Sequence, residues 1–134
     1  MRKQLLSALL PLALIVGGCG SRDPGIVTRV DEYDIELGSS SAPEGEVEFS
    51  VRNDGEVAHQ LVVLRTKHDA DDLPVTDGVV RTDAKGIDEV GSIQLLASGA
   101  SESLRVDLEA GSYVLICNIA GHYPSGMHAP FRVR

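Results

Sequence analysis

The sequence is short of cysteine, of methionine and of positive charge. It has two cysteines, two methionines, and 12 lysines and arginines against 20 aspartates and glutamates, for a formal net charge of −8. Such an acidic chain is a poor candidate for binding nucleic acid, because phosphates select a positive surface. No long segment after residue 18 repeats its apolar residues with a helical period, which argues against a helical bundle. The chain of 134 residues is long enough for one domain and hardly for two.

The first 18 residues have the composition of an export signal. Arg2 and Lys3 precede an apolar run over residues 5–16. This run is too short to span a bilayer comfortably, since spanning takes about 20 residues. The stretch "VGGC", which ends at Cys19, resembles a bacterial lipobox. The resemblance implies a lipoprotein signal peptide over residues 1–18 and a lipid on the sulfur of Cys19. The alternative is an ordinary secretory signal that is cleaved near the glycines.

Residues 19–25 are expected to form a short lipidated tether to a domain over residues 26–134. At roughly 3.5 Å per residue, the tether reaches about 20 Å, which keeps the domain close to the membrane. Removal of the signal takes away two basic and no acidic residues, so that ten basic residues face 20 acidic ones, a net charge of −10. This acidity suits a cationic partner. It is equally compatible with a surface that is merely solvated.

The second cysteine has no disulfide partner in this chain if Cys19 is lipidated. A small exported domain often relies on disulfides, and a lone thiol in an oxidising compartment needs protection or a role. Cys117 is therefore either buried as a small apolar residue or bound to a metal.

Apolar and polar residues alternate along much of the remaining chain, a pattern typical of half-buried strands. The alternation predicts strands over residues 33–37, 46–52 and 103–108, with a weaker strand near residues 25–30 and a last one over residues 131–134. Two more continuously apolar runs, residues 59–65 and 113–117, are typical of central strands. Residues 67–91 are expected to form a long irregular surface excursion, a segment without strands that contains one helical turn. A short strand is expected to follow over residues 93–96. Seven or eight short strands in about 110 residues predict an all-β fold, a Greek-key β-sandwich.

The strongest pattern in the sequence is the spacing C-x4-H-x4-M formed by Cys117, His122 and Met127. A thiolate, an imidazole and a thioether form a soft metal site. Zinc has little use for methionine, whereas copper accepts all three ligands. A mononuclear copper site of this kind needs one more histidine. His59 suits the role, because it opens an apolar strand on the same face as Leu61. The single cysteine in the loop disfavours a binuclear centre.

Each of these residues has a simpler interpretation when it is taken alone. Cys117 could be a buried structural thiol, His59 a hydrogen-bonded histidine at a strand end, and Met127 a core residue. The metal site is favoured, because the alternative requires all three simple interpretations to be true at once at this spacing. The other histidines are poorer candidates, since His68 lies in a charged stretch and His128 directly follows Met127 and would point differently.

The succession of "NDGEVAHQLVVL", "LEAGSYVLICNIAGHYPSGM" and a closing strand resembles the cupredoxins, the blue copper electron-transfer proteins. The resemblance covers roughly Tyr33 to Arg134. The interval between cysteine and histidine is most similar to that of the rusticyanin, auracyanin and sulfocyanin group, whereas plastocyanin has a shorter one. This resemblance implies one type 1 copper ion, with His59, Cys117 and His122 as trigonal ligands and Met127 as the long axial ligand.

Three further residues are expected around the ligands. Gln60 stands where the family usually has asparagine, so its N–H is expected to reach the sulfur of Cys117, while the bracing by its longer side chain is in question. Asn118 directly follows the cysteine and is expected to support the ligand loop. The carbonyl of Ala58 is expected as a remote axial contact, which only part of the family has.

The sequence as a whole predicts an exported, membrane-anchored type 1 copper protein that carries single electrons. It would be a monomer on the outer, periplasmic face of the cytoplasmic membrane, with redox protein partners such as a cytochrome c or a terminal oxidase. No enzyme activity is expected, since neither a nucleophile–base pair nor an open metal position is evident. One alternative is a copper storage or delivery protein with the same ligands, and another is a sandwich used only for protein contacts. An apolar docking patch around His122 is expected from Ile119, Ala120, Tyr123, Pro124, Ala129 and Pro130.

Overall fold

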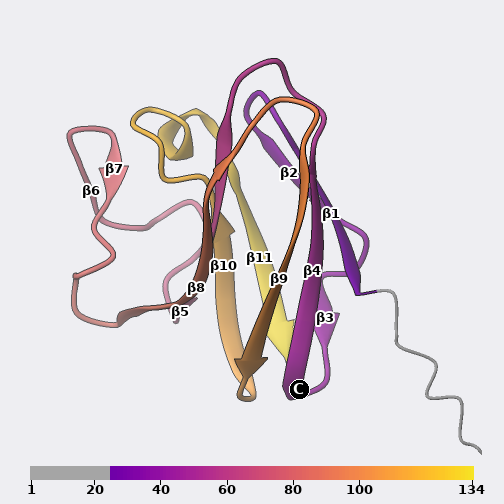
Figure 1. The fold of residues 1–134 in the computed structure, drawn as a ribbon. Coiled ribbons are helices and arrows are strands. Elements are labelled where there is room, and N and C mark those ends of the chain that lie inside the picture. The colour runs from indigo at the N-terminus through magenta and orange to yellow at the C-terminus, as the bar shows by residue number, and fades with distance from the viewer. Residues whose placement is uncertain (1–24) are drawn as a thin grey trace, which may run out of the picture.

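The computed structural model describes residues 25–134, and the predicted signal peptide, the lipidated Cys19 and the tether up to residue 24 lie outside them. The described residues form two β-sheets that face each other and a separate two-stranded hairpin (Figure 1). None of the described residues belongs to a helix long and apolar enough to cross a membrane. The all-β Greek-key sandwich predicted from the sequence is confirmed.

The first sheet has the strand order β2-β1-β4-β9 and the second has the order β3-β11-β10-β5-β8. The strands of the first sheet are β2 (Asp34–Leu37), β1 (Ile26–Asp31), β4 (Gly45–Asn53) and β9 (Ser101–Leu108). Those of the second are β3 (Ser41–Ala42), β11 (His128–Val133), β10 (Gly111–Ile116), β5 (His59–Thr66) and β8 (Ile87–Leu96). Neighbouring strands are antiparallel, except that β1 runs parallel to β4 and β3 parallel to β11.

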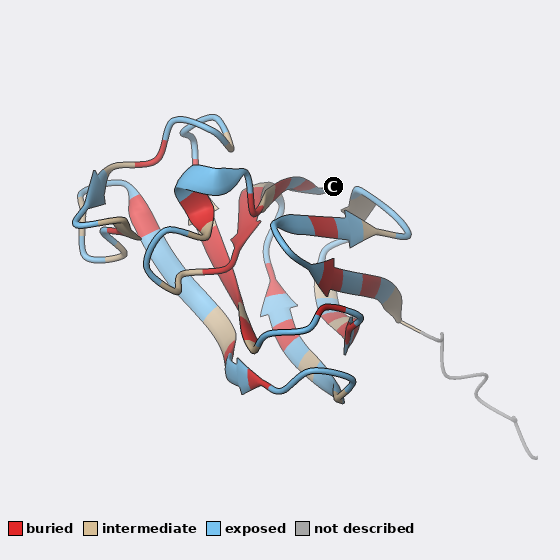
Figure 2. Cartoon of the chain, turned by 90° about the horizontal axis from the view of Figure 1, so that it is seen from above, coloured by how far each residue is buried: buried red, intermediate tan, exposed pale blue. Residues whose placement is uncertain are grey.

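The main core fills the space between the sheets. Alternate residues of β4, among them Phe49 and Val51, meet Leu61 and Val63 of β5 and Leu115 of β10, and all five are at most 1% exposed. Figure 2 shows the buried residues on the strand faces that meet inside the sandwich. Burial of apolar side chains is the dominant favourable contribution to folding, so this layer holds the ends of β5 and β10 at a defined separation.

A second, smaller core lies on the outer face of the β5–β10 pair. Val62 and Leu64 of β5 and Ile116 of β10 pack there against Leu73 and Val80, which belong to the segment between β5 and β8. This segment contains the short hairpin of β6 (Val75–Thr76) and β7 (Val79–Val80), seen at the left of Figure 1. Because both faces of β5 and β10 are covered, these strands are continuously apolar, as their prediction as central strands requires.

The predicted excursion over residues 67–91 is too long at its C-terminal end. Strand β8 begins at Ile87, and the residues before it form turns and the β6–β7 hairpin rather than a helical turn. The predicted strand over residues 93–96 is confirmed as the end of β8. The first part of β8 was missed because it lies at the sheet edge, where residues 88–90 are exposed, and because its pairing with β5 contains register shifts. Gly91 also interrupts the pattern: a Cβ there would lie 2.4 Å from Val106 of β9. The short strand β3 was not predicted either.

Candidate metal centre

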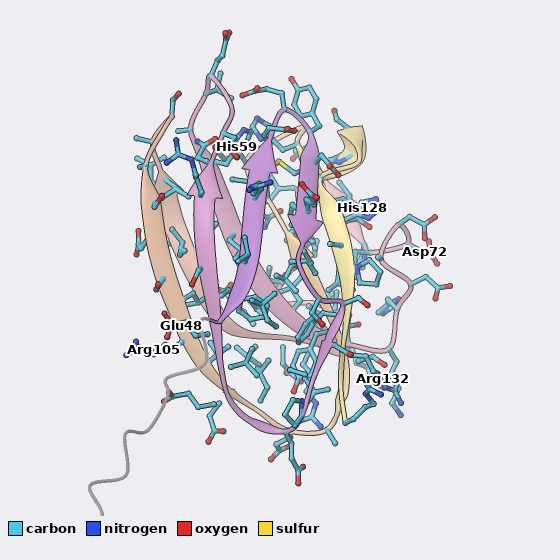
Figure 3. The ribbon with its side chains drawn as sticks, turned by 90° about the vertical axis from the view of Figure 1, so that its right-hand side faces the viewer. Glu48, His59, Asp72, Arg105, His128 and Arg132 are labelled. Carbon is cyan, nitrogen blue, oxygen red and sulfur yellow. The ribbon has the colours of Figure 1, made fainter. Side chains whose placement is uncertain are left out.

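The predicted ligands meet at the end of the sandwich that lies at the top of Figure 1. His59 is the first residue of β5, and Cys117 follows the last residue of β10. The two strands are antiparallel neighbours, so the start of β5 lies beside the end of β10. The loop from Cys117 to Met127 then crosses this end, through the short 3₁₀ helix η1 (Tyr123–Ser125), before β11 begins. Figure 3 shows the position of His59.

Three donor atoms form a compact triangle. The Nδ1 atoms of His59 and His122 are 3.3 Å apart, and the sulfur of Cys117 lies 4.0 Å from the first and 3.4 Å from the second. A trigonal ion with bonds of about 2.0 Å to nitrogen and about 2.3 Å to sulfur separates its donors by roughly 3.5 to 3.8 Å. The triangle therefore fits one metal ion at its centre, and it is the cluster of potential metal ligands found among residues 25–134.

Burial shifts the pKa of two of the donors, Cys117 and His122. His59 and Cys117 are 0% exposed, whereas His122 is half-buried. Burial raises the pKa of the Cys117 thiol, although the N–H groups of Gln60 and Ile119 oppose this effect. Burial also lowers the pKa of His122, and the neighbouring His59 lowers it further. The imidazole of His122 is thus kept neutral and able to bind a metal, while metal binding must displace the thiol proton.

Met127 is 0% exposed, and its backbone is hydrogen-bonded to two residues of the triangle. Its N–H donates to the carbonyl of His122 at 3.2 Å, and its own carbonyl accepts from the N–H of Cys117 at 3.2 Å. Gly126, with a φ of 109°, makes the left-handed turn that ends η1 and brings Met127 back toward the two ligands. A thioether beside a thiolate and two imidazoles is a donor set that suits copper better than zinc.

Gln60 and Asn118 divide the supporting role that the resemblance assigns to them. The N–H of Gln60 donates to the sulfur of Cys117 at 3.3 Å, as expected. Asn118 accepts from the N–H of Val80 at 2.7 Å and donates to the carbonyl of the same residue at 3.1 Å. Asn118 therefore braces the ligand loop against β7. The expected axial role of the Ala58 carbonyl stays a prediction.

The segment between β5 and β8 supports the ligand loop at two further points. The N–H of Gly121 donates to the carbonyl of Gly78 at 2.9 Å. The hydroxyl of Tyr123 donates to the carbonyl of Ala70 at 2.8 Å and accepts from the N–H of Leu73 at 2.9 Å. The sequence predicted only a surface excursion here, but the structure makes this segment part of the scaffold of the site.

Two residues of the β1–β2 turn contact the histidines and were missed from the sequence. Oε1 of Glu32 lies 3.3 Å from Nε2 of His59, and the ring of Tyr33 meets that of His122 edge-on, with centroids 5.3 Å apart. Glu32 is 27 positions from His59, so only the pairing of β1 with β4 brings it there. Tyr33 is 47% exposed and lies at the rim of the site.

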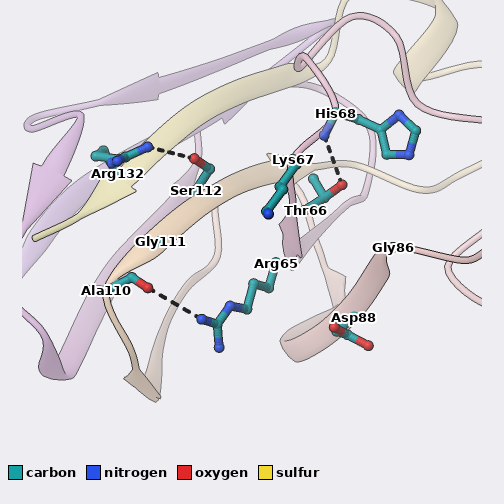
Figure 4. Close-up of a pocket in the computed structure, with 10 residues that line it drawn as sticks. All are labelled: Arg65, Thr66, Lys67, His68, Gly86, Asp88, Ala110, Gly111, Ser112 and Arg132. Carbon is teal, nitrogen blue, oxygen red and sulfur yellow. Dashed lines mark hydrogen bonds between the residues drawn. The ribbon is translucent and has the colours of Figure 1, made fainter.

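The other histidines lie outside the triangle. His128 is on β11, where its ring packs against Tyr123 with centroids 5.2 Å apart (Figure 3). His68 lines a surface pocket at the opposite end of the sandwich, together with Arg65, Lys67 and Arg132 (Figure 4). Both positions agree with the preference for His59.

The expected docking patch is smaller than predicted. Tyr123 and Ala129 are 4% and 7% exposed, because they pack into the two cores. Ala120, Pro124 and Pro130 are exposed. The first two lie in the same loop as His122, and Tyr33 adds an exposed aromatic ring beside that imidazole.

The comparisons with known proteins agree with this geometry. Residues 42–133 match the Sulfocyanin (SoxE) domain family. Auracyanin from the photosynthetic bacterium Roseiflexus castenholzii is 20% identical with a TM-score of 0.61, over 81% of this chain and 94% of that one. An azurin of Methylomonas sp. strain J is 17% identical with a TM-score of 0.60, over 81% and 95%. Rusticyanin from Thiobacillus ferrooxidans is 18% identical with a TM-score of 0.60, over 81% and 75%. At these identities the likeness is one of fold.

A curated protein, the probable 6-oxopurine nucleoside phosphorylase of Thermococcus kodakarensis, is 26% identical to this chain over 108 residues. The match covers 80% of this chain but only 38% of that protein. This partial likeness does not assign the chain to the phosphorylase family.

Proposed function

The chain belongs to the sulfocyanin family of cupredoxins, with a site for one copper ion, and on this premise we propose that it is a membrane-anchored carrier of single electrons. The observation that carries the proposal is the triangle of Cys117, His59 and His122, with buried Met127 beside it. Bound copper supplies a one-electron couple between Cu(II) and Cu(I). A donor protein gives up one electron to the site and an acceptor protein takes it.

The surroundings of the ligands suit rapid electron transfer because they resist movement. One ligand lies on a strand, and the others lie on a loop that Asn118, Gly121 and Tyr123 tie to the segment between β5 and β8. A site held in this way changes its geometry little when its charge changes. Burial of the ligands also excludes water from the site and argues against easy release of the metal. This favours a carrier over a copper delivery protein. We propose a carrier rather than an enzyme.

The half-buried imidazole of His122 is the proposed path for the electron. It is the triangle member that reaches toward solvent, whereas His59 and Cys117 are 0% exposed. Around it lie Ala120, Pro124 and Tyr33, which are exposed. We propose that a redox protein such as a cytochrome c or a terminal oxidase docks on this end, and that the acidic surface favours a cationic partner.

The resemblance of the stretch before Cys19 to a lipobox supports the proposed anchor. The tether is short, so the protein would stay at the outer face of the cytoplasmic membrane as a periplasmic monomer. To test this, the full chain and its Cys19→Ala variant are produced in a bacterial host, and the membrane and soluble fractions are compared. The variant is expected in the soluble fraction, and its continued presence in the membrane would count against lipidation.

The copper site is tested by the visible spectrum of the full chain after addition of Cu(II). Charge transfer from the thiolate to copper should give an intense blue colour, which Cys117→Ser should lose. A colourless copper complex of the wild-type protein would contradict the type 1 assignment. The blue protein is then mixed with reduced cytochrome c and, separately, with a copper chelator. Fast bleaching by the cytochrome and slow loss to the chelator are expected, and the reverse order would favour copper delivery.

A further inference from the structure

We propose that Glu32 is a positioning residue of the copper site, which fixes the orientation of His59 and lowers the reduction potential. The inference rests on the proposed function, because it concerns the redox equilibrium of the same site. Its basis is the distance of 3.3 Å between Oε1 of Glu32 and Nε2 of His59. The imidazole is 0% exposed, while the carboxylate side chain is 34% exposed.

The first consequence of this contact is the choice of tautomer. A neutral imidazole has one N–H, and an ionised carboxylate can only accept a hydrogen bond. Nε2 of His59 therefore carries the hydrogen and donates it to Glu32, and the lone pair of Nδ1 points into the triangle. Nδ1 is indeed the atom that faces His122 and Cys117. A hydrogen bond at the distant nitrogen of a metal-binding imidazole fixes its ring and raises its basicity.

Glu32 is itself held in place by the loop that leads into β5. Its Oε1 accepts hydrogen bonds from the N–H groups of Glu56 at 2.9 Å and of Val57 at 3.0 Å. The absence of a side chain at Gly55 leaves room for the carboxylate, since a Cβ there would lie 2.4 Å from Oε1. The hydrogen bond from Val57 is also the largest of the causes that lower the pKa of Glu32. The carboxylate is thus built into the site by backbone donors and by a glycine.

The second consequence is electrostatic. A fixed negative charge on the far side of an imidazole ligand stabilises Cu(II) more than Cu(I), because the oxidised site carries one more positive charge. Glu32 therefore acts against the apolar shell around the ligands, which favours the reduced state. We expect the balance between the two influences to set the potential of this protein.

The closing experiment measures the reduction potential of the full chain and of Glu32→Gln. Glutamine keeps a carbonyl oxygen that can accept from Nε2 of His59 and from both amides, but it lacks the charge. The variant should stay blue, and its redox equilibrium should shift about tenfold toward Cu(I), an increase of about 59 mV. The control is Glu56→Gln, which removes an exposed charge nearby and keeps the backbone N–H that donates to Glu32. Its shift should be several-fold smaller.

Two further variants separate position from charge. Glu32→Ala removes the acceptor as well, so the affinity for Cu(II) should fall about 10- to 100-fold in addition to the change in potential. Gly55→Ala leaves Glu32 in the chain but pushes its carboxylate away from His59, so its potential should move in the same direction as that of Glu32→Gln.

The outcomes are distinguishable. Equal potentials for Glu32→Gln and Glu56→Gln, in variants that remain blue, would overturn the role of Glu32 and leave the proposed function standing. A wild-type copper complex that is colourless would overturn the proposed function and this inference with it. An upward shift that is confined to Glu32→Gln, Glu32→Ala and Gly55→Ala would support both.

Discussion

The two histidines of the copper site are held by different parts of the molecule. His59 belongs to a central strand, is completely buried, and has its distant nitrogen against Glu32. His122 belongs to a loop, is half-buried, and packs edge-on against the exposed ring of Tyr33. One imidazole is enclosed by the core and the other faces the outside. Under the two proposals above, the histidines have separate tasks: His59 anchors and tunes the site, and His122 connects it to a partner.

The supports of the two histidines also differ. The region around His59 depends on the main core and on the β1–β2 turn, which belongs to the first sheet. The loop of His122 depends on the β6–β7 hairpin and its neighbours through Asn118, Gly121 and Tyr123. The β1–β2 turn contacts both histidines, through Glu32 and Tyr33. A change outside this turn on one side should leave the other side largely intact, and the following variants test this expectation.

The largest expected contrast comes from replacing each histidine with glycine. Both His59→Gly and His122→Gly should lose the blue colour. Imidazole added from solution should restore it in His122→Gly, because that cavity opens to solvent, but not in His59→Gly, whose cavity is enclosed. Absorption spectra during a titration with imidazole give the result. Equal restoration of the two variants would remove the proposed distinction between an enclosed and an open ligand.

Replacement of Met127 should have a smaller effect on the copper site than replacement of either histidine. Met127→Leu should keep the colour, since the thioether is a weak axial ligand, and should raise the potential by about 59 mV or more, a tenfold change in the one-electron equilibrium. Voltammetry of the two proteins measures the shift. If the variant no longer bound copper, Met127 would be a stronger ligand than the type 1 geometry allows.

Asn118 tests the support of the loop without touching a donor atom. Asn118→Ala leaves the N–H and the carbonyl of buried Val80 without their side-chain partner. The free energy of unfolding should fall by about 1–3 kcal/mol. Denaturant unfolding of the copper-free protein measures it. Asn118→Asp serves as a partial control, because it can still accept from Val80 but cannot donate. An unchanged free energy of unfolding in Asn118→Ala would show that the hairpin does not support the loop.

The smallest expected effect is a pH dependence of the copper-free protein. Burial and His59 lower the pKa of His122 in the folded state. A group of this kind stabilises the fold above its unfolded pKa of about 6.5, and that stability is lost as the pH falls below this value, because the unfolded imidazole binds the proton more readily. The thermal midpoint should therefore decline between pH 7 and 5, and decline less in His122→Gln. Parallel curves would assign the dependence to other groups.

The sequence alone was enough to predict the ligand set because the metal chemistry is local. Cys117, His122 and Met127 lie within one loop, and their spacing restricts the possible metals before any fold is known. The strands were predictable for a similar reason, since alternation along β4 or β9 records directly which face is buried. Only the last residues of β8, 93–96, were predicted as a strand, because the rest of this edge strand contains Gly91 and a register shift against β5 and keeps no such record.

The contacts that tune and support the site were decided by tertiary structure. Glu32 and Tyr33 are unremarkable as residues of a hairpin turn. They reach the two histidines only because β1 pairs with β4 in the first sheet, which places the β1–β2 turn beside the site. The segment between β5 and β8 looked like a solvated excursion, yet its backbone holds Asn118 and Tyr123. Hydrogen bonds between distant segments leave no periodic trace in a sequence, whereas a metal demands particular side chains. The sequence therefore determined what is bound, and the fold decided how it is held.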